Sequence, residues 1–272
     1  MDELAKKGRV VRPYIGASLV DKDIANRYGF DIDLHDGIFV MKVWEGSPSA
    51  KAGLRPGDII LKFNGEKIDK VVELRGKLAE LKVGDSVDVV VLRGGAEETI
   101  HMTLEEIPEE NRKMKITIAC VGKIKEKYLT AGIEEFTKRL QPFCKLETIA
   151  IGEERMPEDP SPALKEQVLG RETERLLAVL PENSYVILLD VSGKAVSSPE
   201  LAAKIEKLAL AGSSHITFVI GGAFGYTDAL RHRADERISF SKMTFTHQMI
   251  RLLLVEQIYR AFKISRGEKY HW

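Results

Sequence analysis

Two short segments in the second half of the chain place chemically useful residues where predicted strands end. Leu189-Asp190 closes one apolar run, and Gly221-Gly222 follows another. Glycine leaves no side chain between the backbone and a neighbouring molecule, and ligands of parallel α/β sheets bind beyond the carboxyl ends of the strands. The two segments therefore predict a ligand pocket, although a glycine pair of this kind also occurs in plain strand-to-helix turns.

The elements that would carry these segments alternate between strands and helices. Apolar runs of strand type and stretches with helical periodicity follow one another from residue 115 onward. Strands are predicted at 115–121, 146–151, 185–190 and 216–220, and helices at 126–140, 161–179, 199–210 and 246–263. This alternation is typical of an α/β domain with a parallel sheet.

The first hundred residues have a different pattern, in which short β-type runs are separated by turn residues. Strands are predicted at 37–43, 58–64, 86–93 and 98–104, and one amphipathic helix at 71–81. Asn64-Gly65 is a strong signal for a two-residue hairpin turn. We expect a small β-rich barrel or sandwich. His35 and His101 stand alone in this part, which favours a core or surface role over catalysis.

Charge divides the chain in the same place. Residues 1–110 contain 16 Lys and Arg against 21 Asp and Glu, a net charge of −5; because the whole chain has 41 of each, residues 111–272 carry +5. The acidic stretch 105–113 contains proline and has no apolar periodicity, so we interpret it as a linker between domains at 1–104 and 114–272. The positive charge of the second domain is compatible with RNA binding but does not establish it.

Composition limits the class of protein. The chain has 272 residues, 44% hydrophobic and 30% charged, which excludes wholesale disorder and fits two folded domains. No apolar run approaches the roughly 20 residues of a membrane helix, and the N-terminus lacks the apolar region of a secretory signal. Cys120 and Cys144 form no CxxC pair. We expect a cytoplasmic protein without a membrane partner and without a metal site.

Two motifs in the first domain point to a known family. They are Arg12-Pro-Tyr-Ile-Gly-Ala and Ser47-Pro-Ser-Ala-Lys-Ala-Gly-Leu-Arg-Pro-Gly-Asp-Ile-Ile-Leu. With them, residues 10–105 resemble the PDZ domain of HtrA-type serine proteases, and residues 1–12 resemble the linker before it. The resemblance implies that Tyr14, Ile15, Gly16 and Ala17 bind the terminal carboxylate of a peptide, which adds as a strand beside helix 71–81. The alternative is that the glycines serve turns alone. Because no protease domain or Gly-Asn-Ser-Gly-Gly motif is present, we expect no proteolysis.

Five further motifs stand in order in the second domain. They are Lys115-Ile-Thr-Ile-Ala-Cys-Val-Gly-Lys-Ile-Lys-Glu-Lys-Tyr, Leu188-Leu-Asp-Val-Ser-Gly-Lys, Phe218-Val-Ile-Gly-Gly-Ala-Phe-Gly, Phe240-Ser-Lys-Met-Thr-Phe-Thr-His-Gln-Met-Ile-Arg and Glu256-Gln-Ile-Tyr-Arg-Ala-Phe-Lys-Ile-Ser-Arg-Gly-Glu-Lys-Tyr-His. From Met114 onward the chain resembles the SPOUT-class methyltransferases that N3-methylate a pseudouridine in helix 69 of 23S ribosomal RNA. The resemblance implies a trefoil α/β knot, a homodimer, S-adenosylmethionine as cofactor and the large ribosomal subunit as partner.

The same resemblance implies which residues form the site. Cofactor contacts are expected from Leu189, Gly221, Phe240, Ser241, Lys242, Met243, Thr244 and Phe245. Because N3 of the uracil ring carries a proton, a residue must remove the proton or stabilise the nitrogen anion. The candidates for this catalytic role are His247, Arg260, Tyr270 and His271, and packing at a helix N-terminus is the alternative for His247. The apolar helix that starts at Met249 offers a face for the dimer.

Two other interpretations stay open. The chain could be a peptide-binding adaptor whose knotted half is an inactive dimerisation domain. Alternatively, two neighbouring genes could have been joined, naturally or artificially.

Overall fold

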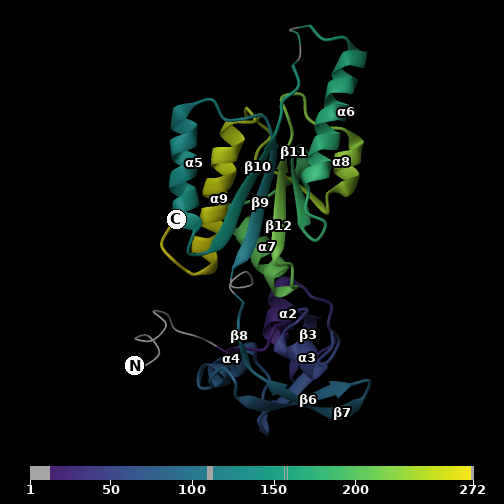
Figure 1. The fold of residues 1–272 in the computed structure, drawn as a ribbon, viewed down its shortest axis with the longest axis vertical. Helices are drawn as coiled ribbons and strands as arrows, with labels where there is room; N and C mark the ends of the chain where they lie inside the picture. The colour runs from purple at the N-terminus through teal and green to yellow at the C-terminus, as the bar shows by residue number, and fades with distance from the viewer. Residues whose placement is uncertain (1–12, 109–112, 156, 158, 271–272) are drawn as a thin grey trace. The chain divides into compact units, whose positions relative to one another are not determined.

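The computed structural model describes residues 13–108, 113–155, 157 and 159–270 (Figure 1). The chain divides into two compact units, with the main boundary between Arg112 and Lys113 and the short segment Lys207–Gly212 grouped with the first, and each unit has its own sheet and hydrophobic core. The segment 1–12 and the candidate catalytic residue His271 lie outside the described residues. No helix within the described ranges is long and apolar enough to cross a membrane.

The N-terminal unit is a β-rich domain of antiparallel strands. Its main sheet has the order β2-β3-β4-β6-β7 with β5 beside β4, and β1 pairs separately with β8. The strands are β1 (Pro13–Tyr14), β2 (Ala17–Val20), β3 (Ile38–Val43), β4 (Ile59–Phe63), β5 (Glu66–Lys67), β6 (Ser86–Arg93), β7 (Ala96–Thr103) and β8 (Glu105–Glu106). The helices are α2 (Lys22–Tyr28), α3 (Pro48–Ala52) and α4 (Val71–Ala79). The predicted small β-rich domain with a helix near 71–81 is confirmed.

Turn and cap residues determine where several of these elements begin. Asn64 and Gly65 both have positive φ, 49° and 81°, as a two-residue hairpin turn requires, and they join β4 to β5. Asp21 caps α2 by accepting from Ile24 N at 2.9 Å, and its second carboxylate oxygen accepts from Val71 N at 2.8 Å. One buried carboxylate therefore fixes the starts of both α2 and α4.

The C-terminal unit is a five-stranded sheet of order β10-β9-β12-β11-β13 in which every neighbouring pair is parallel. The strands are β9 (Met114–Val121), β10 (Cys144–Ile151), β11 (Tyr185–Ala195), β12 (His215–Ile220) and β13 (Glu236–Ser239). The helices are α5 (Lys127–Leu140), α6 (Pro162–Val179), α7 (Ser198–Leu210), α8 (Asp228–Arg233) and α9 (Met249–Ser265). Helices α5 and α9 pack together on one side of the sheet, and α6 and α8 on the other (Figure 1). The predicted α/β class is confirmed.

Apolar strand residues form the core of this unit. Val121, Leu188 and Val219 lie on three neighbouring strands and are completely buried, together with Leu176 from α6. Burial of such side chains stabilises the fold by roughly 1.5–3 kcal/mol each. The central strands are thus rigidly packed, and their carboxyl ends form a fixed base for the loops that follow.

The structure differs from the sequence-based prediction mainly beside these loops. The sequence does not predict α8 or β13, which have only six and four residues. Strand β11 continues beyond the predicted end at residue 190, because its pairing with β13 shifts register between Leu189 and Lys194. The last helix begins at Met249 rather than at residue 246. A loop of irregular backbone therefore separates β13 from α9.

The segment interpreted as a linker is partly structured. Glu105 and Glu106 form β8 and pair with Tyr14 and Pro13 of β1. The N-terminal unit therefore extends into the predicted linker, whose residues 109–112 lie outside the described parts.

Candidate functional site

A cavity of about 1000 Å³ opens at the carboxyl ends of the parallel strands. Its walls come from residues 189–191 of β11, from the end of β12 and the turn at 221–226, from the loop between β13 and α9, and from the first turn of α5. This volume is at the upper end of the range of small-molecule sites, which measure about 300–1000 Å³. Leu189, Asp190, Gly221 and Gly222 all line it, as expected for the ends of predicted strands.

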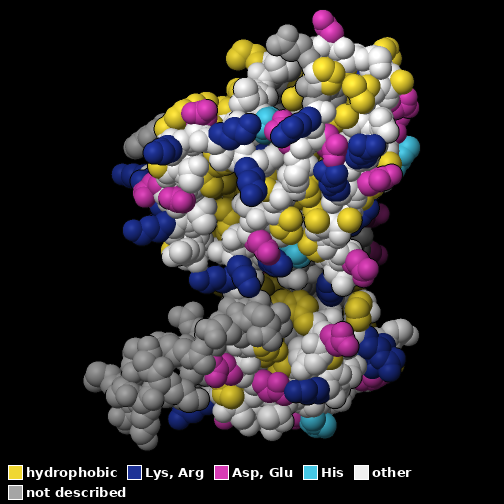
Figure 2. All heavy atoms as spheres, turned by 45° about the horizontal axis from the view of Figure 1, so that its top comes forward, with side chains coloured by type: hydrophobic (Ala, Val, Ile, Leu, Met, Phe, Trp, Pro, Cys, Tyr) yellow, Lys and Arg dark blue, Asp and Glu magenta, His cyan; other side chains and the backbone are white. Residues whose placement is uncertain are grey.

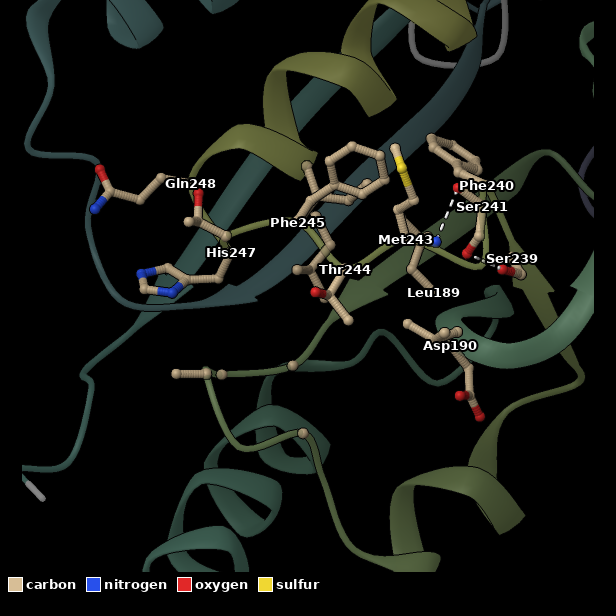
Figure 3. Close-up of a pocket in the computed structure, with 18 of the residues that line it drawn as sticks. Leu189, Asp190, Ser239, Phe240, Ser241, Met243, Thr244, Phe245, His247 and Gln248 are labelled. Carbon is tan, nitrogen blue, oxygen red and sulfur yellow. Dashed lines mark hydrogen bonds between the residues drawn. The ribbon is translucent and has the colours of Figure 1, made fainter. Parts of the chain in front are cut away.

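The loop before α9 supplies most of the apolar lining. Figure 3 shows Phe240, Met243 and Phe245 on one side of the cavity, with His247 at one end and Asp190 at the other. The loop is held by its own hydrogen bonds: Ser239 Oγ donates to the carbonyl of Ser241 at 2.9 Å, and Met243 N donates to Ser241 Oγ at 3.0 Å. These short-range bonds give the loop a defined shape without regular secondary structure.

All but one of the predicted cofactor residues line the cavity. Lys242 does not line it, whereas seven do: Leu189, Gly221, Phe240, Ser241, Met243, Thr244 and Phe245. The sequence signal for Lys242 was only its place within the run, which does not determine where its side chain lies.

The glycine pair has a structural reason that the sequence did not reveal. A Cβ at Gly221 would lie 2.6 Å from the ring of Tyr226 and 2.9 Å from the carbonyl oxygen of Gly225. A Cβ at Gly222 would lie 2.6 Å from Glu172 Oε2. Both glycines therefore let the 221–226 turn pack against protein atoms, and this packing alone explains the absence of side chains there.

Asp190 is a buried carboxylate in the wall of the cavity. Ser192 donates to its Oδ1 from both N, at 2.9 Å, and Oγ, at 2.8 Å, and Arg237 Nη1 lies 3.3 Å from its Oδ2. Burial opposes its ionisation, but the hydrogen bonds from Ser192 and Tyr226 and the charge of Arg231 together outweigh burial and hold the pKa of Asp190 below its usual value. Asp190 is therefore an ionised carboxylate that is paired with arginine in the wall of the cavity.

His247 lies half-buried where the loop meets α9, and it lines the cavity. Burial lowers the pKa of its imidazole; the charge of Glu153 acts against this, whereas Arg251 and Lys125 lower the pKa further. The next residue is anchored, because Gln248 Oε1 accepts from Lys125 N at 2.9 Å. The geometry offers a neutral imidazole at neutral pH, which can accept a proton.

Arg260 and Tyr270 form a separate cluster near the end of α9. Arg260 Nη2 pairs with Glu256 Oε1 at 2.6 Å, Arg260 Nη1 donates to the carbonyl of Tyr270 at 3.2 Å, and its guanidinium lies 4.8 Å from the centre of the Tyr270 ring. Neither residue lines the cavity. Since a helix rises about 1.5 Å per residue, Arg260 lies about 16 Å along α9 from Met249 at its start. Of the candidate catalytic residues that the structure describes, Arg260 and Tyr270 are therefore not brought together with His247 in one chain.

The PDZ-like loop lies beside a groove of the N-terminal unit. Tyr14, Ile15, Gly16 and Ala17 line it together with apolar residues of α4, including Leu74. Gly16 has φ +78°, and a Cβ there would lie 2.2 Å from Ser47 Cβ, so packing requires a glycine. Strand β2 stands at the edge of its sheet, where an extended peptide can add.

Sequence reasoning missed three polar residues near the cavity. Tyr226, whose hydroxyl lies 3.4 Å from the carbonyl oxygen of Leu189, follows the glycine motif, whereas Glu153 and Glu172 come from loop and helix segments without a motif. Asp190 carried a signal, because it ends a predicted strand. In the described parts of the chain, no group of three or more His, Cys, Asp or Glu side chains is arranged to hold a metal ion.

Comparison with known proteins divides the chain in the same way as its fold. Residues 114–271 match the family described as "Predicted SPOUT methyltransferase", and residues 13–104 match the PDZ domain family. The ribosomal RNA large subunit methyltransferase H of Halothermothrix orenii is 55% identical over 158 residues, which are 58% of this chain and 99% of that protein. The protein of the same name from Clostridioides difficile is 51% identical over the same shares of both chains.

Solved structures similar to this chain include HtrA-type proteases. AlgW bound to a decapeptide has 25% sequence identity and a TM-score of 0.34, covering 39% of this chain and 32% of its own. The serine endoprotease of Yersinia pestis has 32% identity and a TM-score of 0.32, covering 40% of this chain and 34% of its own. The chain thus spans about a third of these proteases.

Proposed function

The chain belongs to the SPOUT methyltransferase family through residues 114–271, and on this premise we propose that it methylates N3 of a pseudouridine in helix 69 of 23S ribosomal RNA. The observation that carries the proposal is the cavity at the carboxyl ends of the strands, where Leu189, Gly221 and the loop at 240–247 come together. The methyltransferase H proteins to which residues 114–271 are similar act, by name, on large-subunit ribosomal RNA.

The residues of the cavity fit S-adenosylmethionine, the methyl donor of this family. Leu189, Phe240 and Met243 offer apolar surface for an adenine ring. When bound, S-adenosylmethionine supplies an electrophilic methyl group on a sulfonium. The protein has to hold the donor and the nucleobase in line, and such positioning accounts for most of the rate in displacement reactions.

Proton removal from N3 falls to His247 in this proposal. Its imidazole lines the cavity, and burial keeps it neutral at neutral pH, so its free nitrogen can accept the proton as the methyl group arrives. Arg260 and Tyr270 are about three helical turns away in the same chain and cannot assist from there. We assign their contribution to the partner subunit's Arg260 and Tyr270 in a homodimer.

Exposed apolar side chains around the cavity support such a dimer. Tyr128, Val191, Phe224, Met243 and Phe245 are all exposed, and all line the cavity. A second copy that covered them would bury apolar surface and close the site against water. Figure 2 shows Lys and Arg side chains, interspersed with Asp and Glu, over the visible face of the C-terminal unit, and these cations can contact RNA phosphates.

The N-terminal unit is assigned to peptide binding. In this proposal the groove beside α4 takes the free C-terminus of another protein, with the backbone of residues 14–17 facing the carboxylate. A cytoplasmic location and a trefoil knot in the C-terminal unit complete the proposal, and no proteolysis is part of it.

One assay tests the activity. Large ribosomal subunits with an unmethylated pseudouridine are incubated with the full chain and labelled S-adenosylmethionine, and we expect one methyl group per subunit at helix 69. The rival function, a peptide-binding adaptor with an inactive dimerisation domain, predicts no labelling. Calorimetric titration separates the two further, because the adaptor would also fail to bind the cofactor.

A further inference from the structure

Three elements of the C-terminal unit meet at Gly122, directly after β9. Gly122 N donates to the carbonyl of Ile151 at 2.9 Å, so the ends of β9 and β10 stay side by side. Gly122 has φ +78°, and the position of a Cβ on it lies 3.3 Å from Glu153 Oε2 and 3.4 Å from His247 Nε2. A carboxylate and an imidazole nitrogen therefore lie over the same glycine, one from the loop after β10 and the other from the loop before α9.

A buried arginine of α9 holds the backbone of Gly122 in place. Arg251 is buried, and its Nη2 donates to the carbonyl oxygens of Val121 and Gly122, the second at 2.8 Å. Arg251 lies in the first turn of α9, four residues after His247 in the chain. The guanidinium therefore fixes the backbone of the glycine that both the imidazole and the carboxylate approach.

We propose that Glu153 is a positioning residue for His247, and that its carboxylate sets both the tautomer and the basicity of the imidazole. A carboxylate on the Nε2 side favours the tautomer with the proton on Nε2, which leaves Nδ1 free to accept. This inference rests on the proposed role of His247 as proton acceptor. Neither the sequence motifs nor the family matches assign a role to Glu153.

The charged groups that face His247 are few. Arg251 on α9 and Lys125 in the loop after β9 disfavour a proton on the imidazole, and Glu153 is the carboxylate that opposes them. Without Glu153, two cations and partial burial would all act in one direction, and the imidazole would become a weaker base.

Glu154 offers a matched control beside Glu153. Its carboxylate is engaged by Arg175 and Arg171, and its backbone N donates to Glu172 Oε1 at 2.9 Å. Replacing Glu154 by Gln therefore removes the same charge one residue away, from a side chain that is directed to α6 rather than to His247.

The test is a titration of His247 in the full chain by NMR of its ring nitrogens, with the signal assigned by its loss in His247→Gln. In Glu153→Gln we expect the midpoint to fall by about half a pH unit and the tautomer ratio to move toward the proton on Nδ1. Glu154→Gln should leave both unchanged, and Glu153→Asp should restore them in part. An unchanged His247 titration in Glu153→Gln, or an equal change in Glu154→Gln, would overturn the pairing.

Turnover on large subunits gives the second readout. In Glu153→Gln we expect kcat to fall about tenfold. The acid limb of the pH profile of kcat should move to lower pH, together with the midpoint of the His247 titration. A shifted titration with an unchanged pH profile would show that the pair has no part in the reaction, which also overturns the proposal. If no variant or wild type methylated RNA, the proposed function would fail, while the titration would still decide whether Glu153 controls His247.

Discussion

No side chain fits at Gly222, because a Cβ there would lie 2.6 Å from Oε2 of the buried Glu172. Oε1 of the same carboxyl group accepts from Glu154 N at 2.9 Å, so Glu172 is not free to turn away. Burial raises the pKa of Glu172, which is expected of a carboxyl group on α6 that packs against the segments after β10 and β12.

Gly222→Ala should therefore disturb the glycine turn and weaken cofactor binding. We expect a loss of stability of about 1–3 kcal/mol from the forced shift, and a clear loss of S-adenosylmethionine affinity in calorimetric titration. Gly152→Ala is the control, since its Cβ would meet only Arg175 Nη1 at 3.8 Å. In the double variant Gly222→Ala with Glu172→Ala, part of the cofactor affinity should return. If Gly222→Ala and the control Gly152→Ala bound the cofactor equally well, the packing at Gly222 would not matter for binding.

His247→Ala should lower turnover far more than cofactor affinity, because the imidazole is assigned to the nucleobase. The pH profile gives a further check. A base acts in its neutral form, and since burial lowers the pKa of His247, activity should persist below the ordinary histidine pKa of about 6.5 and fall at more acidic pH. His232→Ala, an exposed histidine on α8 that does not line the cavity, should behave as wild type. If His247→Ala left the pH profile of activity unchanged, His247 would have no role in the reaction.

The dimer should have a mass near twice 30.4 kDa by light scattering and should share its active sites. If each site uses His247 of one chain and Tyr270 of the other, His247→Ala and Tyr270→Ala should each be inactive alone. A mixture of the two should recover about a quarter of the activity, since half of the dimers are mixed and each has one intact site. No recovery after exchange of subunits would place both residues in one chain.

Removal of the PDZ domain should leave methylation intact. We expect the protein of residues 114–272 to retain cofactor affinity and to methylate large subunits, because the cavity is built from residues of that segment alone. At low salt it should associate faster with ribosomes, since the removed residues contribute negative charge. An inactive but folded and cofactor-binding truncated protein would mean that the PDZ domain takes part in substrate recognition.

The N-terminal unit should depend on one buried ion pair. Asp58 is almost fully buried and accepts from Arg93 Nε at 2.8 Å and Nη2 at 2.7 Å. Arg93→Met leaves the buried carboxylate uncompensated and should cost about 3–5 kcal/mol. Thermal unfolding should show a lower midpoint for this unit, whereas Lys51→Met, which breaks an exposed pair with Glu105, should change it little.

Long, regular elements of this fold could be predicted from sequence, and short ones could not. The turn at Asn64-Gly65 follows from local backbone preference, and the parallel strands follow from their apolar runs. Strand β13 could not be predicted because residues 236–239 have no hydrophobic pattern typical of a strand. They form a strand because they pair with β11.

The site was predictable in its location and only partly in its residues. Leu189 and Gly221 line the cavity as expected, because strand ends are visible in the sequence. That Glu153 and His247 both approach Gly122 depends on which strand lies beside β9, and no local pattern contains that information. For the same reason, the sequence could not show that Arg260 and Tyr270 lie away from His247 in one chain.

The order of strands has a consequence for synthesis on the ribosome. The N-terminal unit pairs its own first and last strands, Pro13 with Glu106, so it can fold as soon as residue 106 has left the exit tunnel. The C-terminal unit cannot fold so early, because β9 lies between β10 and β12. Ile116 of β9 pairs with Ile216 of β12, which is synthesised about a hundred residues later. Contacts this distant in sequence form slowly. During translation the growing chain therefore carries a finished N-terminal unit while the apolar β9 still lacks one of its neighbours.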